Sequence, residues 1–199
     1  MRPYTYKALT STDPLDVISL NQIKNYLKIE LTETSEDDFL TLLISGAVDF
    51  VQKYTKRQLL TTQFLTYRDY WSYQEELRKS RFVELDSVKY YTDDVLTTFD
   101  TDNFYSTDEN DFSKIILKDN KTFPDLDNRV QAIQITFKAG YGTTSSSIPD
   151  DILIALRSHI AFMYSNRGDC IEILSKISTA IPPTARMIYE KYRIIDIIL

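Results

Sequence analysis

Hydrophobic and polar residues change their spacing sharply within residues 133–167. Ile133, Ile135 and Phe137 alternate with polar residues, which is the period of a half-buried strand. A stretch rich in Gly, Thr and Ser follows, and Pro149 then begins a pattern of helical spacing. That pattern places four apolar residues on one stripe, at Ile152, Leu156, Ile160 and Met163. We therefore predict a strand, a Gly-Tyr-Gly turn and a buried helix, around which the rest of the chain folds.

The same helical spacing predicts further helices on both sides of the middle of the chain. Together with the helix just described, they cover residues 19–28, 36–57, 149–167 and 183–192. Ser19 with Gln22 fits a capping box, and Ser35 followed by acidic residues is a second N-cap pattern. Gly46 lies inside the long helix, where it costs roughly 1 kcal/mol relative to Ala. We therefore expect a close helix crossing at Gly46.

The middle of the chain has the composition and alternation of β-strands. Candidate strands cover residues 61–71, 82–91, 95–99, 114–117 and 130–137. Residues 92–111 hold seven acidic residues and no basic one. A run of like charges is usually solvated, so we expect this segment to be a solvent-facing loop.

These patterns predict an α+β fold that is mainly helical. We expect a small helical bundle with an inserted antiparallel β unit and an extended C-terminal tail. The predicted divisions are an N-terminal arm at 1–18, one domain at 19–193 and a tail at 194–199. Within the domain, the helical core covers 19–60 and 148–193, and the β-rich insertion covers 61–138.

Composition narrows the classes of function. The chain has 199 residues, 43% of them hydrophobic, which suits one folded domain with a real core. Its net charge of −6 argues against a broad DNA-gripping surface. Cys170 is the only cysteine, so no internal disulfide forms, and no apolar run resembles a signal peptide or a membrane span. We expect a soluble protein that is made in the cytoplasm.

No set of residues in the sequence forms a recognisable active site, so we assign no catalytic, metal-binding or cofactor-binding residue. His159 is the only histidine and falls beside the apolar stripe, which favours a core or interface position. Cys170 has no activating pattern around it, and residues 145–147 lack the glycine pattern of a nucleophilic serine. Asp150 and Asp151 are explained by the helix dipole at least as well as by acid–base chemistry.

Four segments, taken in order, resemble the head–tail connector (adaptor) proteins of tailed bacteriophages and phage-like gene-transfer particles. The first two are SLNQIKNYLKIE and SEDDFLTLLISGAVDFVQKYTKRQLLTTQF. The last two are ITFKAGYGTTSSSIPDDILIALRSHIAFMYSNRG and IPPTARMIYEKYR. Their order and spacing carry the resemblance, which covers about half of the chain.

The resemblance implies a structural virion protein and no enzyme. Family members form a ring between the portal protein and the tail or stopper protein, and DNA passes through the centre without sequence-specific binding. The resemblance also implies that the protein is made in the host cytoplasm and ends at the head–tail interface of the virion. It implies no membrane partner. We expect the chain to bind itself as a closed ring, with twelve copies as the expectation.

The C-terminal tail is the predicted partner-binding segment. Residues 194–199 read IIDIIL, and a free tail of this composition would favour aggregation of a soluble monomer. Since the family's closing helix ends at Tyr192 and Arg193, we predict that the tail docks on the portal or on an adjacent subunit. The predicted contact residues are Arg186, Tyr189, Tyr192, Arg193, Ile194, Ile195, Ile197, Ile198 and Leu199. Burial of the tail against the protein's own core is the alternative.

Two other classes of function remain open at this point. One is a small cytoplasmic enzyme that uses carboxylates scattered along the sequence. The other is a helical protein-interaction module. The oligomeric state, with and without portal, distinguishes them from a ring-forming connector.

Overall fold

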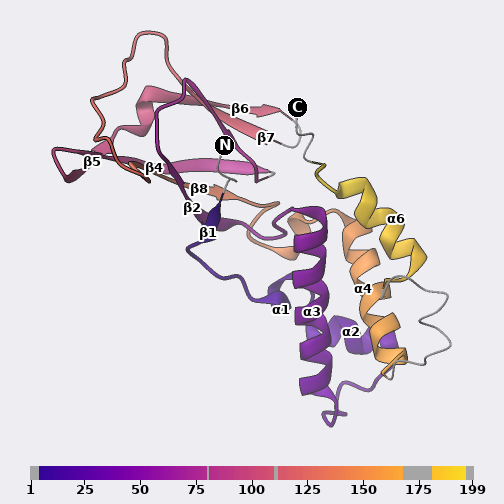
Figure 1. Cartoon of the computed structure of the whole chain (residues 1–199). Helices are drawn as coiled ribbons and strands as arrows, with labels where there is room; N and C mark the ends of the chain where they lie inside the picture. The colour runs from indigo at the N-terminus through magenta and orange to yellow at the C-terminus, as the bar shows by residue number, and fades with distance from the viewer. Residues whose placement is uncertain (1–4, 80, 110–111, 168–180, 196–199) are drawn as a thin grey trace. The chain divides into compact units, whose positions relative to one another are not determined.

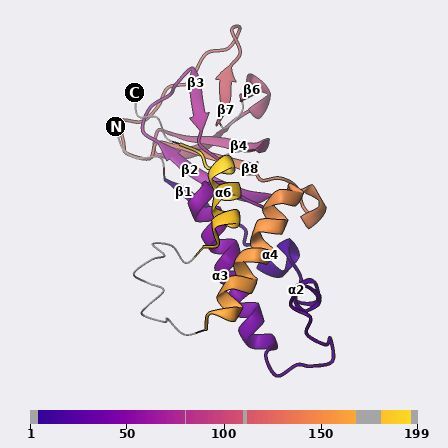
Figure 2. The same cartoon turned by 90° about the vertical axis from the view of Figure 1, so that its right-hand side faces the viewer.

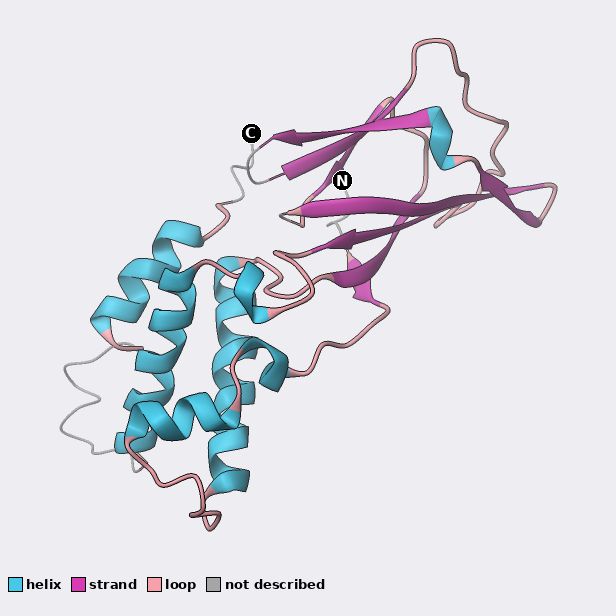
Figure 3. Ribbon diagram, turned by 180° about the vertical axis from the view of Figure 1, so that it is seen from behind, coloured by secondary structure: helices cyan, strands magenta, loops and turns pink. Residues whose placement is uncertain are grey.

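The computed structural model describes residues 5–79, 81–109, 112–167 and 181–195 (Figure 1). The chain divides into two compact units. The first contains Met1–Thr12 and Leu60–Tyr141, and the second contains Asp13–Leu59 and Gly142–Leu199. All described strands belong to the first unit and all described α-helices to the second (Figure 3).

The first unit is built from two antiparallel sheets. The larger sheet has the strand order β1-β2-β8-β4-β5, and the smaller sheet has the order β3-β7-β6. The strands of the larger sheet are β1 (Tyr6–Ala8), β2 (Thr62–Arg68), β4 (Phe82–Thr92), β5 (Val95–Phe99) and β8 (Ile133–Ala139). Those of the smaller sheet are β3 (Gln74–Leu77), β6 (Phe104–Glu109) and β7 (Phe112–Leu117), and a short 3-10 helix, η1 (Thr101–Asn103), precedes β6.

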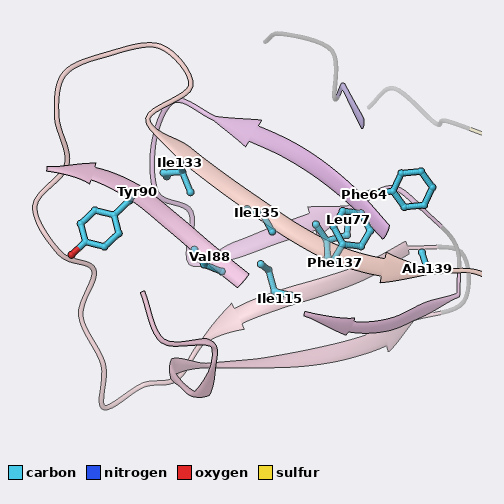
Figure 4. Close-up of a cluster of buried hydrophobic side chains, with 9 residues drawn as sticks. All are labelled: Phe64, Leu77, Val88, Tyr90, Ile115, Ile133, Ile135, Phe137 and Ala139. Atoms are coloured by element: carbon cyan, nitrogen blue, oxygen red, sulfur yellow. The ribbon is translucent and has the colours of Figure 1, made fainter. Parts of the chain in front are cut away.

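Both sheets contribute side chains to one hydrophobic core (Figure 4). In β8, every second residue from Ile133 to Ala139 is buried, as the alternation in the sequence predicts. Leu77 of β3 and Ile115 of β7 enter the same core from the smaller sheet. The complete cluster is Phe64, Leu77, Val88, Tyr90, Ile115, Ile133, Ile135, Phe137 and Ala139.

The prediction of a mainly helical bundle is wrong. The strands form two sheets in a unit of about half the chain, which is too large for a small insertion in a helical protein. The missed strands, β1, β3 and β6, explain the error. β3 reads QEEL and β6 reads FYSTDE, so neither shows a clean apolar alternation. Their strand conformation comes from pairing with β7, a long-range interaction that local patterns do not contain.

The helices of the second unit pack against each other, and Figure 2 shows α4 beside α3 and α6. They are α1 (Pro14–Val17), α2 (Leu20–Leu27), α3 (Asp37–Thr55), α4 (Asp150–Ser165) and α6 (Pro183–Tyr192). Ser19 and Gln22 form the predicted capping box at the start of α2. The predicted N-cap at Ser35 is wrong, because α3 begins after Glu36 and its cap makes no side-chain hydrogen bond.

Two glycines have different roles. A methyl group built on Gly46 would meet no atom within 4 Å, so no close helix crossing explains this residue and that expectation is wrong. Gly140 has a φ of +149°, and a methyl group there would lie 2.6 Å from backbone atoms of Leu60 and Thr61. Gly140 therefore allows the chain after β8 to approach its neighbour closely.

Two polar stretches hold more regular structure than their sequences predict. Within residues 1–18, β1 pairs with β2, and Pro14 begins α1 at a position where proline is tolerated. The acidic segment 92–111 is not a plain loop, since it contains η1 and β6 in addition to β5, which matches the predicted strand at 95–99. Its acidic side chains at 93, 94, 100 and 102 are nevertheless exposed to solvent.

Candidate partner-binding surface

Helix α6 is fixed to the helical unit by a buried aromatic side chain. Tyr189 is fully buried, and its ring lies 6.5 Å from Phe50, 6.4 Å from Tyr54 and 6.0 Å from His159. Burial raises the pKa of the Tyr189 hydroxyl, which has no hydrogen-bond partner within the described part of the chain. Tyr189 was predicted to contact a partner. In the structure its side chain lies inside the helical unit, where it fixes the orientation of α6.

Polar contacts hold the last turn of α6 against the start of α4. Tyr192 donates its hydroxyl to Asp151 at 2.7 Å, and the ammonium group of Lys191 lies 3.0 Å from the other carboxylate oxygen. Desolvation opposes ionisation of Asp151, but the hydrogen bonds from Tyr192 and Lys191 outweigh it and lower the pKa. Asp151, a candidate acid–base residue in the sequence, is therefore occupied in a contact between helices.

The two arginines predicted at the rim are both exposed. The Arg193 guanidinium lies 5.2 Å from the centre of the Tyr54 ring and 3.7 Å from the Glu190 carboxylate. The hydroxyl of Tyr54 also donates to Glu190. Arg193 is thus held near the end of α3 with its charge accessible, which is a geometry that suits polar contacts with a partner.

The chain after α6 leaves from an anchored residue. Ile194 is buried, and its backbone N–H donates to the carbonyl oxygen of Thr55 at 3.0 Å. The next residue, Ile195, is 71% exposed. The remaining predicted contact residues, Ile197, Ile198 and Leu199, lie outside the described residues. The structure thus separates Ile194, which completes the unit, from Ile195, the first residue of the tail that is available to a partner.

Several residues of this surface were not predicted from the sequence. Met187 on α6 is 70% exposed, and Thr55, Asp151 and Glu190 hold the segment in place. The sequence offered one indication for Met187, because α6 leaves it off the buried stripe that contains Ala185 and Tyr189. No local pattern indicates the contact of Thr55 with Ile194, which joins distant parts of the chain.

The described residues contain no group that suggests catalysis. His159 is buried, with its ring 5.3 Å from that of Phe50, so it lies in the core of the helical unit as expected. Within the described ranges, no three His, Cys, Asp or Glu residues gather where they could hold a metal ion. Cys170 lies outside these ranges. None of the described helices is both long and apolar enough to span a membrane.

Solved structures of other proteins share this fold. The fold closely matches chains of gene transfer agent (GTA) particles over 98% of this chain and 97% of each of those chains. A chain from the neck of an empty GTA particle, computed with C6 symmetry, has a TM-score of 0.77 at 16% identity. Chains from the virion of the native particle and from its neck, computed with C12 symmetry, both have TM-scores of 0.74, at 16% and 15% identity. The TM-scores, over almost the whole chain, establish a shared fold.

The family follows from the sequence itself. A family model described as phage gp6-like head-tail connector protein matches residues 17–118. The chain therefore belongs to the phage gp6-like head-tail connector family, whose members are structural proteins and not enzymes. No curated protein matches the sequence.

Proposed function

We propose that this chain forms an adaptor ring in the neck of a phage-like particle, between the portal and the tail or stopper. DNA passes through the centre of the ring without sequence-specific contacts. The observation that carries this proposal is the family match combined with a fold shared along almost the whole chain with GTA neck proteins. The protein is then made in the host cytoplasm and ends at the head–tail interface of the virion.

Twelve copies are the proposed ring size. Support comes from one of the matching chains, which belongs to a neck computed with C12 symmetry. A ring requires two different surfaces on each copy, one that meets the preceding copy and one that meets the next. The acidic side chains at 93, 94, 100 and 102 are exposed. We propose that they face the channel or the outside of the ring, where their negative charge would repel the phosphates of DNA.

The tail is the proposed docking segment, on the portal or on an adjacent subunit. Its first exposed residue, Ile195, follows directly after the anchored Ile194, so the tail leaves the unit at a defined point. Arg186 and Arg193 make polar contacts at the rim of the docking site. Aliphatic residues provide the burial, and the arginines provide orientation and salt dependence.

A truncation tests this docking. Removal of residues 194–199 would also remove the buried Ile194, so the sharper variant ends at Ile194 and lacks only residues 195–199. We expect that variant to stay folded and to lose ring formation on purified portal, as seen by negative-stain electron microscopy. Ile154→Ala is the matched control, because it truncates an exposed aliphatic side chain, 57% exposed on α4, outside the removed segment. Unchanged ring formation by the truncated chain would contradict the docking role.

A further inference from the structure

β5 is the outermost strand of the larger sheet, and its outer backbone edge has no strand partner among the residues that the structure describes. Figure 1 shows the strand beside β4. Proteins usually protect such edges with short strands, charges, proline or bulges. The other edge strands follow that rule, since β1 has three residues and both β3 and β6 carry acidic residues. β5 reads VLTTF and pairs with β4 in unbroken register, so it has none of these protections.

The hairpin that presents β5 is held in a defined conformation. Asp93 and Asp94 form its two-residue turn with φ values of 50° and 59°. The Asp127 carboxylate accepts the backbone N–H groups of both turn residues at 2.9 Å. Because hydrogen bonding alternates along an antiparallel ladder, Leu96 and Thr98 direct their backbone groups to the open edge. Thr98 is exposed, and Leu96 is 39% exposed.

The inner face of β5 continues an aromatic cluster but ends at the open edge. The Phe99 ring lies 5.6 Å from Trp71, 5.4 Å from Phe104 and 6.4 Å from Phe123. Val95 shares this face by the alternation of the strand and is 60% exposed. An added strand with an apolar residue at every second position would extend the cluster and cover Val95.

The chain contains one segment with this pattern next to an anchored residue. Ile195, Ile197 and Leu199 alternate with Asp196 and Ile198, and residues 195–199 equal β5 in length. Ile194 holds the start of the segment, while Ile195 is exposed. In the added strand, the three alternating aliphatic residues would face the Phe99 cluster.

We infer that the β5 edge of one copy receives residues 195–199 of a second copy as an added strand. The inference rests on the proposed function, because it names the partner and the site of the docking tail. It also supplies a head-to-tail contact, since the donating tail and the receiving edge are different surfaces of the same chain.

Disulfide trapping tests the pairing. In a Cys170→Ser background, Thr97→Cys is placed in one tagged population and Ile197→Cys in a second. These positions are central, so they lie opposite each other whether the added strand runs parallel or antiparallel. We expect a disulfide between the two populations, in concentrated free chain or in rings on portal. Ser106→Cys in place of Thr97→Cys is the matched control, because Ser106 is exposed on β6, an edge of the other sheet.

Two edge variants make the test specific. Thr98→Pro removes an N–H group from the open edge and leaves the β4 side of the ladder intact. Leu96→Lys adds a charge to the same edge and serves if the proline variant does not fold. We expect either change to abolish the disulfide with Ile197→Cys. A disulfide that persists in a folded edge variant would overturn the inference.

Other outcomes separate this inference from the proposed function. If Ile197→Cys links only to Ile197→Cys of another copy, only to portal, or equally to Ser106→Cys, the β5 site is wrong. Rings that form on portal without any link to position 97 would overturn the β5 site and leave the adaptor function standing. Failure to form rings on portal would contradict the proposed function itself.

Discussion

The backbone N–H of Ile194 donates to the carbonyl oxygen of Thr55, the last residue of α3, at 3.0 Å. The last carbonyl groups of a helix lack partners within the helix, so this bond satisfies one that would otherwise need another partner. The side chain of Ile194 is also buried. The bond and the burial together fix the point from which the tail begins.

Ile194 and Ile195 are therefore expected to respond oppositely to truncation. Ile194→Ala should lower the free energy of unfolding by about 3 kcal/mol, because it removes buried methyl groups and leaves a cavity. Ile195→Ala should leave that free energy nearly unchanged, since Ile195 is 71% exposed. Chemical denaturation of both variants measures the difference. Equal effects would show that the boundary between core and tail is misplaced.

Gly46→Ala should stabilise the protein. Gly46 is exposed within α3, and a methyl group there meets no atom within 4 Å. Because alanine favours the helix over glycine, we expect a gain of about 1 kcal/mol in the free energy of unfolding. Gly140→Ala is the contrasting variant and should destabilise, since its methyl group would approach backbone atoms at 2.6 Å. A loss of stability in Gly46→Ala would reveal a packing constraint at that position.

An ion pair lies near the core of the β unit. Arg68 of β2 and Glu75 of β3 join the two sheets, with side chains only 14% and 11% exposed. Desolvation raises the pKa of Glu75, and the nearby Arg68 partly offsets that effect. Glu75→Leu removes the carboxylate that neutralises the largely buried Arg68 charge, so it should cost about 3 kcal/mol.

A double variant shows whether Arg68 and Glu75 stabilise the protein as a coupled pair or independently of each other. Arg68→Met combined with Glu75→Leu should recover most of the lost stability, because a well-packed apolar pair can replace a buried ion pair. Urea denaturation of the two single variants and the double variant forms the complete cycle. Simple addition of the two single losses would contradict a coupled pair.

Glu36 should make the free energy of unfolding fall with pH in the acidic range. Hydrogen bonds from Arg167 and Tyr164 lower the pKa of the Glu36 carboxyl to about 2. A lowered pKa in the folded state contributes stability above the ordinary pKa of the carboxyl, and that contribution is lost as pH falls towards 2. Glu36→Gln should flatten this part of the curve of stability against pH, whereas Glu30→Gln, at an exposed position, should not. Identical curves for the wild type and Glu36→Gln would contradict this contact.

The helices could be predicted closely from the sequence because their information is local. The predicted range 183–192 coincides with α6, and the capping pair Ser19 and Gln22 marks the start of α2. The apolar stripe and the cap of a helix lie within a few turns of each other. The residues that define the helix are therefore all found in one short segment of the sequence. The strand β8 was also evident, because it is buried at every second residue.

Three edge strands, β1, β3 and β6, and the anchor of the tail could not be predicted for the opposite reason. β6 lies in the acidic segment and becomes a strand by pairing with β7. The role of Ile194 depends on Thr55, which is far away in the sequence. The IIDIIL pattern indicated a docking segment, but only the structure distinguishes the buried Ile194 from the exposed Ile195.

The central claim is that the chain forms an adaptor ring on a portal. Native mass spectrometry of the purified chain, with and without portal, tests it most directly, and electron microscopy images of the same samples show the geometry. The account predicts a portal complex that carries a closed ring of this chain, with twelve copies as in a neck of C12 symmetry. A chain that stays monomeric and ignores the portal at all concentrations would contradict it.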